Sequence, residues 1–164
     1  GPYSASLIHA VSKQRNEIPL IWCDTGFNTQ QTLNFAKRIE QSLPIDLKRY
    51  KPSKKYSESE LPSESGEAFQ NFVNDVKLEP FKRALAEHNP DVWFTNIRRG
   101  QTAYRDTLDI LSLTSDGVLK VSPFYYWSDT ELRGYLSQYN LPNEFIYFDP
   151  TKPKSNLECG IQFK

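Results

Sequence analysis

Apolar and polar residues follow one another along this chain with periods that predict alternating strands and helices. Helical spacing of apolar residues occurs over residues 5–14, 30–42, 67–76, 80–88 and 128–139. Continuous apolar runs over residues 18–23, 91–95 and 117–121 are typical of buried strands, and residues 45–50 alternate as a strand does. Strands and helices in this order predict a mostly parallel sheet with helices on both faces.

Capping signals and breaks set the limits of these elements. Asn28 or Thr29 caps the second helix, and Ser128 with Glu131 forms a capping box for the last one. Residues 51–66 are polar and interrupted by prolines, which predicts a surface loop with solvated lysines. The stretch 141–156 is extended and proline-rich, and we expect a mobile tail from about residue 150 to 164.

Composition narrows the class of protein. The 164 residues suggest a single domain, and equal numbers of basic and acidic residues, 20 each, argue against a general nucleic-acid binder. The two cysteines lie far apart, so we expect no disulfide framework, no metal site and no iron–sulfur cluster. No apolar run is long enough for a membrane span and no signal peptide is evident, which favours a reduced, cytoplasmic protein.

Polar residues follow two of the predicted strands. Asp24, Thr25 and Gly26 come directly after the first apolar run, at the point where ligands bind in open α/β sheets. Arg98, Arg99, Gln101 and Arg105 follow the run at 91–95. Arginine forks match phosphate and sulfate oxygens, so this segment predicts an anion site, with a solvated basic loop as an equal alternative.

A cysteine lies just short of the C-terminus. Cys159 stands in the sequence LECGIQFK, after a stretch that contains Lys152 and Lys154. Lysines nearby favour the thiolate, which is the nucleophilic form of cysteine. Most lone cysteines are inert, however, and Cys23, inside the first apolar run, is most simply a small core residue.

Four stretches taken together resemble the phosphoadenosine phosphosulfate (PAPS) reductase family, within the adenine nucleotide α-hydrolase-like fold. They are residues 20–26 (LIWCDTG), residues 93–101 (WFTNIRRGQ) with Arg105, residues 117–123 (GVLKVSP) with Trp127, and residues 158–161 (ECGI). Gln162 stands where the family has histidine, and Ser4 matches the end of the family's phosphate loop. The resemblance implies a three-layer α/β sandwich with a mostly parallel, doubly wound central sheet.

The resemblance also implies an activity in sulfate assimilation. The Cys159 thiolate would attack the sulfur of PAPS and displace adenosine 3′,5′-bisphosphate, and thioredoxin or glutaredoxin would then release sulfite. Arg98, Arg99 and Arg105 would hold sulfate and phosphate oxygens, and Gln101 lies in the same motif. Ser4, Asp24, Thr25 and Gly26 would line the nucleotide pocket. No bound cofactor is implied, since the extra cysteines of iron–sulfur members are absent.

Two other functions stay open from the sequence. One is a catalytically degenerate protein that keeps the scaffold and binds a nucleotide, which would retain binding after Cys159→Ser. The other is an adenylylating enzyme of the ATP-pyrophosphatase type, which would need a complete Ser-Gly-Gly phosphate loop. The sequence does not decide between a monomer and a homodimer, or between PAPS and adenosine phosphosulfate.

Overall fold

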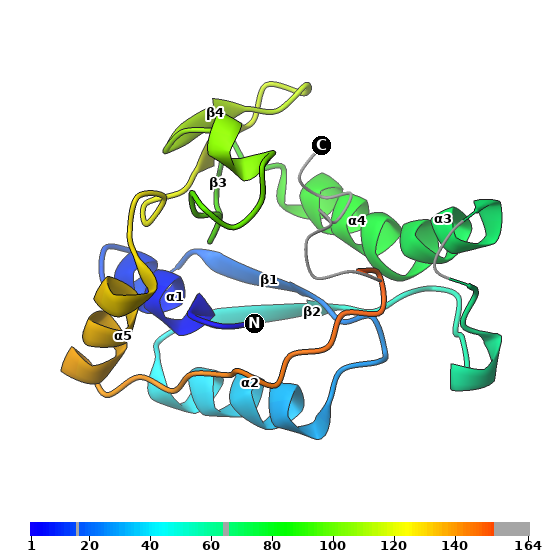
Figure 1. The fold of residues 1–164 in the computed structure, drawn as a ribbon, viewed down its shortest axis with the longest axis horizontal. Helices are drawn as coiled ribbons and strands as arrows, with labels where there is room; N and C mark the ends of the chain where they lie inside the picture. Colours follow the sequence, from blue (N-terminus) through cyan, green and yellow to red (C-terminus); the bar gives the residue numbers. More distant parts are fainter. Residues whose placement is uncertain (16, 64–65, 153–164) are drawn as a thin grey trace.

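The computed structural model describes residues 1–15, 17–63 and 66–152 and shows a mixed α/β fold (Figure 1). The helices are α1 (Ser4–Ser12), α2 (Gln30–Ser42), α3 (Glu67–Val73), α4 (Glu79–His88) and α5 (Asp129–Gln138), with the short helical segments η1 (Glu58–Glu60), η2 (Asn74–Leu78) and η3 (Arg105–Thr107). The strands are β1 (Pro19–Cys23), β2 (Asp46–Tyr50), β3 (Val92–Phe94), β4 (Leu111–Leu113) and β5 (Leu119–Val121). None of the described helices is long and apolar enough to cross a membrane.

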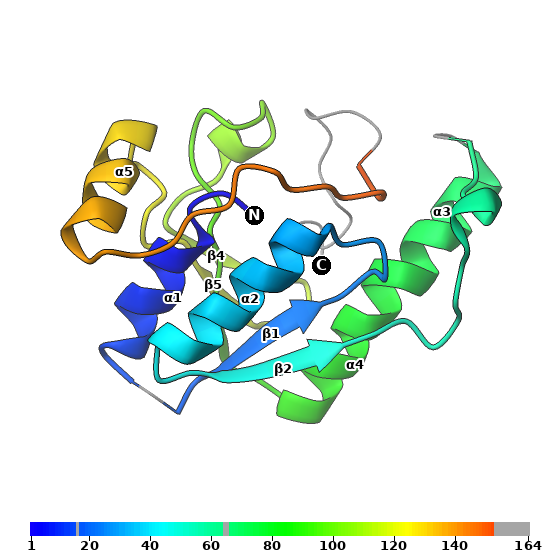
Figure 2. The same cartoon turned by 90° about the horizontal axis from the view of Figure 1, so that it is seen from below.

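The described strands form two small sheets. In the first, β1 pairs with β2 in parallel, and α2 and α4 lie on its opposite faces (Figure 2). In the second, β5 lies between β3, which is parallel to it, and β4, which is antiparallel. The parallel pairs match the strand–helix order of the sequence, whereas one continuous doubly wound sheet is not seen among the described residues.

Burial of the strands differs from the sequence prediction. The apolar runs at 18–23 and 91–95 were expected to be buried, but β1 is half-buried along its length, and Val92 and Phe94 of β3 are 42% and 40% exposed. The unpredicted strand β4 exposes Leu113 by 70%. The physical reason is the split of the sheet, because β3 and β4 are outer strands and lack the cover that a continuous apolar run leads one to expect.

Local helix signals were confirmed. Thr29, rather than Asn28, caps α2, because its side chain accepts a hydrogen bond from the Thr32 amide. The capping box of Ser128 and Glu131 is present at the start of α5. These motifs are short-range and depend on three or four consecutive residues, so tertiary contacts do not override them.

The core divides into two clusters. One joins α1, α2 and α5 through buried side chains that include Ala5, Phe35, Ile39 and Leu132. The other lies along α3 and η2 and consists of Phe69, Phe72, Val73 and Val76, with Phe27 and Tyr56 packed against it. The second cluster fixes the two loops that leave β1 and β2, because Phe27 belongs to the first loop and Tyr56 to the second.

The helices predicted over 67–76 and 80–88 are continuous through the π-helical segment η2. Lys77 in η2 is buried and contacts Asp149 and Thr151. The chain segment from residue 141 to 152 runs from α5 past α2, as Figures 1 and 2 both show, and the contacts of Asp149 and Thr151 with Lys77 hold its end against η2. Two further hydrogen bonds hold it, from the Tyr3 amide to Asn143 (2.8 Å) and from the Thr29 hydroxyl to the carbonyl of Ile146 (3.3 Å).

Candidate functional site

The loop that follows β1 is shaped by a buried carboxylate. Asp24 is 2% exposed, and its Oδ1 accepts hydrogen bonds from the Gly26 amide (3.0 Å) and from Asn28. Its Oδ2 accepts a hydrogen bond from Nε of Arg49 in β2 (2.7 Å). Gly26 has a φ of 87°, which a residue with a side chain adopts only with strain. Asp24 and Gly26 therefore fix the turn by which the chain leaves the sheet.

A cavity of about 340 Å³ opens beside this turn. It is lined by Asp24, Thr25, Gly26, Asn28, Leu33, Arg49, Lys51, Pro52, Lys54, Lys55 and Tyr56. These residues come from the carboxyl ends of the parallel strands β1 and β2 and from the start of α2. This is the end of a parallel sheet at which ligands bind, as the sequence predicted for Asp24, Thr25 and Gly26.

The charge of this cavity is strongly positive. Its lining contains four cationic side chains and one carboxylate, and Arg49 already pairs with that carboxylate. Lys54 lies 3.5 Å from Asp75, whose pKa is lowered by a hydrogen bond from Tyr56. Lys51 and Lys55 are exposed and form no ion pair within the described parts of the chain. Two cations without an ion-pair partner give the cavity a positive potential, which favours an anionic ligand over a cationic one.

The sequence did not single out these basic residues, and it assigned the lysines of 51–66 to a solvated loop. The sequence does contain a basic cluster here, because four cationic residues fall within residues 49–55, where β2 ends: Arg49, Lys51, Lys54 and Lys55. A basic run is usually solvent-facing. Only the parallel pairing of β2 with β1 places this run beside Asp24.

The predicted arginine site forms a second group, after β3. The Arg98 side chain is buried; its Nη1 lies 2.7 Å from Asp129 and donates to the carbonyl of Trp127. The guanidinium lies over the ring of Tyr3, 5.1 Å from its centroid. Three partners thus hold the Arg98 side chain, so it stabilises this loop in addition to contributing a positive charge.

Gln101 links the members of the arginine group. Its Oε1 accepts hydrogen bonds from the Arg98 amide (2.9 Å) and from Nη1 of Arg105. Arg99 is exposed, and its backbone amide donates to the carbonyl of Tyr125 (2.9 Å). Ser4 begins α1, directly after the Tyr3 that covers Arg98. The structure therefore brings Arg98, Gln101 and Arg105 together, and Ser4 is joined to them only through its sequence neighbour Tyr3.

The predicted residues of the cavity and those of the arginine group lie at two separate places in the structure. The cavity lining includes Asp24, Thr25 and Gly26 but no residue between 98 and 105. Both groups flank the same short part of the C-terminal segment, since Asn143 contacts Tyr3 and Ile146 contacts Thr29. The catalytic prediction, Cys159, lies outside the described residues. Of the tail predicted from about 150 to 164, residues 150–152 are described, and Thr151 is buried.

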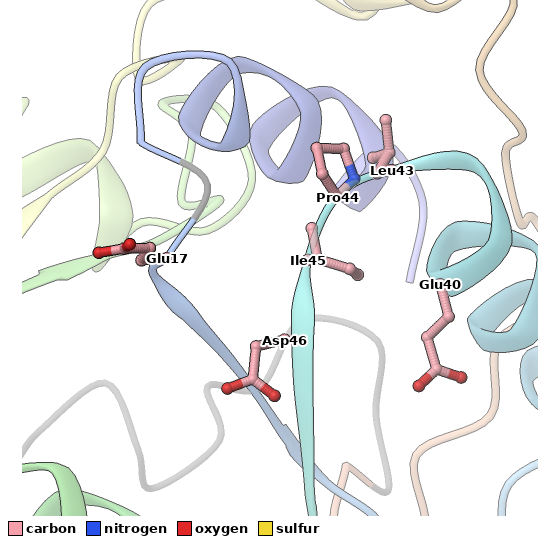
Figure 3. A pocket seen from close by; sticks show the side chains of 6 residues that line it. All are labelled: Glu17, Glu40, Leu43, Pro44, Ile45 and Asp46. Carbon is pink, nitrogen blue, oxygen red and sulfur yellow. The ribbon is translucent and has the colours of Figure 1, made fainter.

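A second hollow lies at the opposite end of the first sheet (Figure 3). Its lining includes the carboxylates of Glu17, Glu40 and Asp46, and Asp46 is the first residue of β2. Within the described ranges, no three histidine, cysteine or acidic residues are grouped so that they could hold a metal ion. This acidic hollow is at the amino end of the strands, away from the predicted ligand residues.

Comparisons with known proteins agree with the family expectation. A model of the phosphoadenosine phosphosulfate reductase domain matches residues 1–150. A phosphoadenosine 5′-phosphosulfate reductase of Photobacterium profundum is 29% identical over 98% of this chain and 63% of its own length. One from Synechococcus is 32% identical over 87% of this chain and likewise 63% of its own length. The chain thus spans less than two thirds of these relatives.

The fold has a counterpart among solved structures. The crystal structure of phosphoadenylyl-sulfate (PAPS) reductase from Candida auris, as a phosphate complex, superposes with a TM-score of 0.70. The match covers 86% of this chain and 70% of the other, at 23% sequence identity. Together, the domain model that spans residues 1–150 and the curated relatives show that this chain belongs to the phosphoadenosine phosphosulfate reductase family.

Proposed function

We propose that this protein is a sulfonucleotide reductase that acts on PAPS and releases sulfite, a step of sulfate assimilation. The observation that carries the proposal is the positively charged cavity beside Asp24, Thr25 and Gly26, in a chain of this family. An adenine nucleotide bound there carries negative charge, which the cations of the cavity and of the arginine group offset. The Glu-Cys-Gly segment at residues 158–160 supplies a nucleophile.

The proposed reaction has two steps. In the first, the Cys159 thiolate attacks the sulfonate sulfur; an S–S bond forms, the S–O bond to the phosphate breaks, and adenosine 3′,5′-bisphosphate leaves. In the second, a thiolate of thioredoxin or glutaredoxin attacks the Cys159 sulfur. Sulfite leaves with the electron pair of the S–S bond, and a second thiol of the reductant closes its disulfide and regenerates Cys159.

The described residues have separate parts in this scheme. Asp24 and Gly26 shape the loop that follows β1. Asp24 accepts hydrogen bonds there from Gly26, Asn28 and Arg49. The arginine group offsets the negative charge that otherwise repels an anionic nucleophile from an anionic substrate. Among these arginines, Arg99 is exposed and Arg98 is held by Asp129, so Arg99 is the freer one to meet a ligand.

The experiment that tests the proposal is intact-mass measurement after reduced protein is mixed with PAPS and no thioredoxin. A single sulfonate adduct is expected, and peptide mapping should place it on Cys159 and not on Cys23. Thioredoxin should remove it with release of one sulfite per protein. Nucleotide binding without an adduct would contradict the reductase proposal and support a degenerate nucleotide-binding protein. Pyrophosphate release from ATP would instead indicate the adenylylating alternative.

Arg99→Glu is expected to raise the KM for PAPS by roughly 10-fold to 100-fold, because one charged hydrogen bond is replaced by repulsion. Steady-state sulfite release measures this change. The matched control is Arg38→Glu, which makes the same charge change on the exposed side of α2. An unchanged KM, or an equal change in both variants, would contradict a role of Arg99 in holding the substrate.

A further inference from the structure

Tyr3, directly before α1, lies where three parts of the chain meet. Its side chain is buried, and the C-terminal segment contacts it twice. Asn143 accepts a hydrogen bond from the Tyr3 amide (2.8 Å), and the Phe145 ring lies edge-on to the Tyr3 ring, with 6.2 Å between centroids. From the loop after β3, the Arg98 guanidinium lies over the same ring, 5.1 Å from its centroid. Tyr3 therefore joins the start of α1 to the arginine group and to the C-terminal segment.

The backbone of Tyr3 has a conformation that tyrosine rarely adopts. Its φ of 62° and ψ of 5° lie in the left-handed region, where a side chain crowds the following carbonyl. Such a conformation persists only where the surrounding structure determines it, and it is common at functional sites. Here the hydrogen bond to Asn143 and the packing of the ring against Arg98 and Phe145 determine it. The position of the ring is therefore fixed by tertiary contacts.

The Arg98 guanidinium keeps one buried donor unused. Its hydrogen bond to the Trp127 carbonyl (3.3 Å) and its ion pair with Asp129 (2.7 Å) are both made by Nη1. Nε is also buried, and it has no hydrogen-bond partner within the described ranges. Leaving a buried N–H without an acceptor is costly, so such a donor indicates a missing ligand or water. The edge of the guanidinium that carries Nε is thus available to an oxyanion.

Other buried polar atoms without a partner gather around the same residue. In the part of the chain that the structure describes, they belong to five residues, all of which lie in or next to this junction: Ser6 of α1, Asn96 and Arg98 after β3, and the neighbours Asn143 and Glu144 of the C-terminal segment. Asn96 donates to the carbonyl of Pro2 (3.5 Å), which places it here too. Unused hydrogen-bonding capacity concentrated at one place indicates that a polar ligand or ordered water completes it.

The C-terminal segment connects this junction to the proposed nucleophile. It is attached to Tyr3 through Asn143 and to η2 through the buried pair of Asp149 and Lys77. Cys159 follows in the sequence, ten residues after Asp149. Tyr3 therefore contacts both an arginine with a donor to spare and the segment that leads to the thiol.

We infer that Tyr3 is a positioning residue for the proposed reaction, on which this inference rests. Its ring orients the Arg98 guanidinium so that Nε donates to the phosphosulfate group of the substrate, and the bond from its amide to Asn143 keeps the ring in place. Tyr3 acts through Arg98 and takes no part in bond formation. An oriented donor stabilises the charge that shifts within the phosphosulfate group as Cys159 attacks, so the effect falls on the rate of sulfonation more than on binding.

The test follows sulfonation of Cys159 in a single turnover, by intact mass after mixing with saturating PAPS and no reductant. The amplitude gives the fraction of folded protein, and the rate constant reports positioning. Tyr3→Leu should lower the rate constant by about 3-fold to 30-fold at full amplitude. Tyr3→Phe keeps the ring and loses only a 3.5 Å contact with Arg133, so it should restore the rate to within about twofold. Asn143→Ala should lower it by about 2-fold to 10-fold.

The matched control is Tyr139→Leu, which removes another tyrosine ring that lies under a cation. Lys13 is 4.9 Å from the centroid of that ring, and neither residue contacts the arginine group in the described structure. Its rate constant should equal that of the wild type. A double-mutant cycle tests the route of the effect. Arg98→Lys keeps the charge but loses the planar fork, so adding Tyr3→Leu to it should cause no further loss.

Three results would overturn the inference: additive losses in the cycle, unchanged rate constants in Tyr3→Leu and Asn143→Ala, or a reduced amplitude at the wild-type rate constant, which a purely structural role produces. No adduct on the wild type would instead contradict the proposed function. The inference is then decided by NMR titration with inorganic sulfate. Sulfate should shift the Arg98 Nε–H resonance, with about 3-fold to 30-fold weaker binding in Tyr3→Leu, and equal affinity in both proteins would overturn it.

Discussion

Replacing Cys159 with serine is expected to lower sulfite release by a factor on the order of 10⁴ or more, with nucleotide affinity unchanged. The serine hydroxyl is a weak nucleophile at neutral pH, and a sulfate ester on serine would not be opened by a thiol of thioredoxin. In the proposed mechanism Cys159 forms and breaks bonds and does not hold the nucleotide, so its loss should affect the chemical step and not binding. Steady-state sulfite assays and calorimetric titration of adenosine 3′,5′-bisphosphate measure the two effects.

The chain contains its own control for this experiment. Cys23 is the other cysteine of the chain. It is half-buried in β1, directly before Asp24. Cys23→Ser removes a thiol without removing the proposed nucleophile, and its activity should stay within about threefold of the wild type. If Cys23→Ser were the inactive variant and Cys159→Ser the active one, the assignment of the nucleophile would be wrong.

Features encoded over a few residues were predictable from the sequence. The helix at Gln30–Ser42 was predicted with the bounds that the structure shows, because a cap at Thr29 and a clear apolar face define it. The capping box at Ser128 was likewise visible. Asp24, Thr25 and Gly26 were placed correctly at the end of a parallel strand, because an apolar run followed by a polar turn indicates such an end.

Features that depend on distant contacts were not predictable. The apolar runs at 18–23 and 91–95 predicted strands. They did not predict that the strands form two small sheets, because the pattern within a strand does not show which other strands it pairs with. The antiparallel strand at Leu111–Leu113 was not predicted, because its three residues are too few to show a strand period among polar neighbours. The basic cavity was missed because it needs β2 to lie beside β1, which the charges of the loop alone do not reveal.

A second large effect is expected at the buried ion pair between η2 and the C-terminal segment. Lys77 and Asp149 are 8% and 9% exposed, they pair directly, and Thr151 receives a 3.0 Å hydrogen bond from Lys77. Lys77→Ala leaves the Asp149 carboxylate buried without its counter-ion, which should lower the free energy of unfolding by about 3–5 kcal/mol. Urea unfolding followed by circular dichroism measures the loss.

The matched control is the exposed pair of Lys48 and Asp46, whose charged atoms lie 3.1 Å apart. Lys48→Ala should cost less than about 1 kcal/mol, because water already solvates both side chains. The double variant Lys77→Met/Asp149→Leu should recover part of the loss, since an apolar pair leaves no unpaired charge in the core. A loss below about 1 kcal/mol in Lys77→Ala would contradict the interpretation of a buried, stabilising pair.

The pH dependence gives the same pair an independent test. Burial alone would raise the pKa of Asp149, but attraction to Lys77 and hydrogen bonds from Lys77 and Thr151 outweigh it and hold the pKa below the ordinary value of an aspartate. A lowered pKa in the folded state means that the pair stabilises the protein fully above the unfolded-state pKa. That stability is lost as the pH falls through the folded-state pKa. The difference in unfolding free energy between wild type and Lys77→Ala should therefore be largest near neutral pH and shrink in acid. A difference that stays constant from neutral pH into acid would assign the effect of Lys77→Ala to lost packing of the lysine side chain and not to its charge.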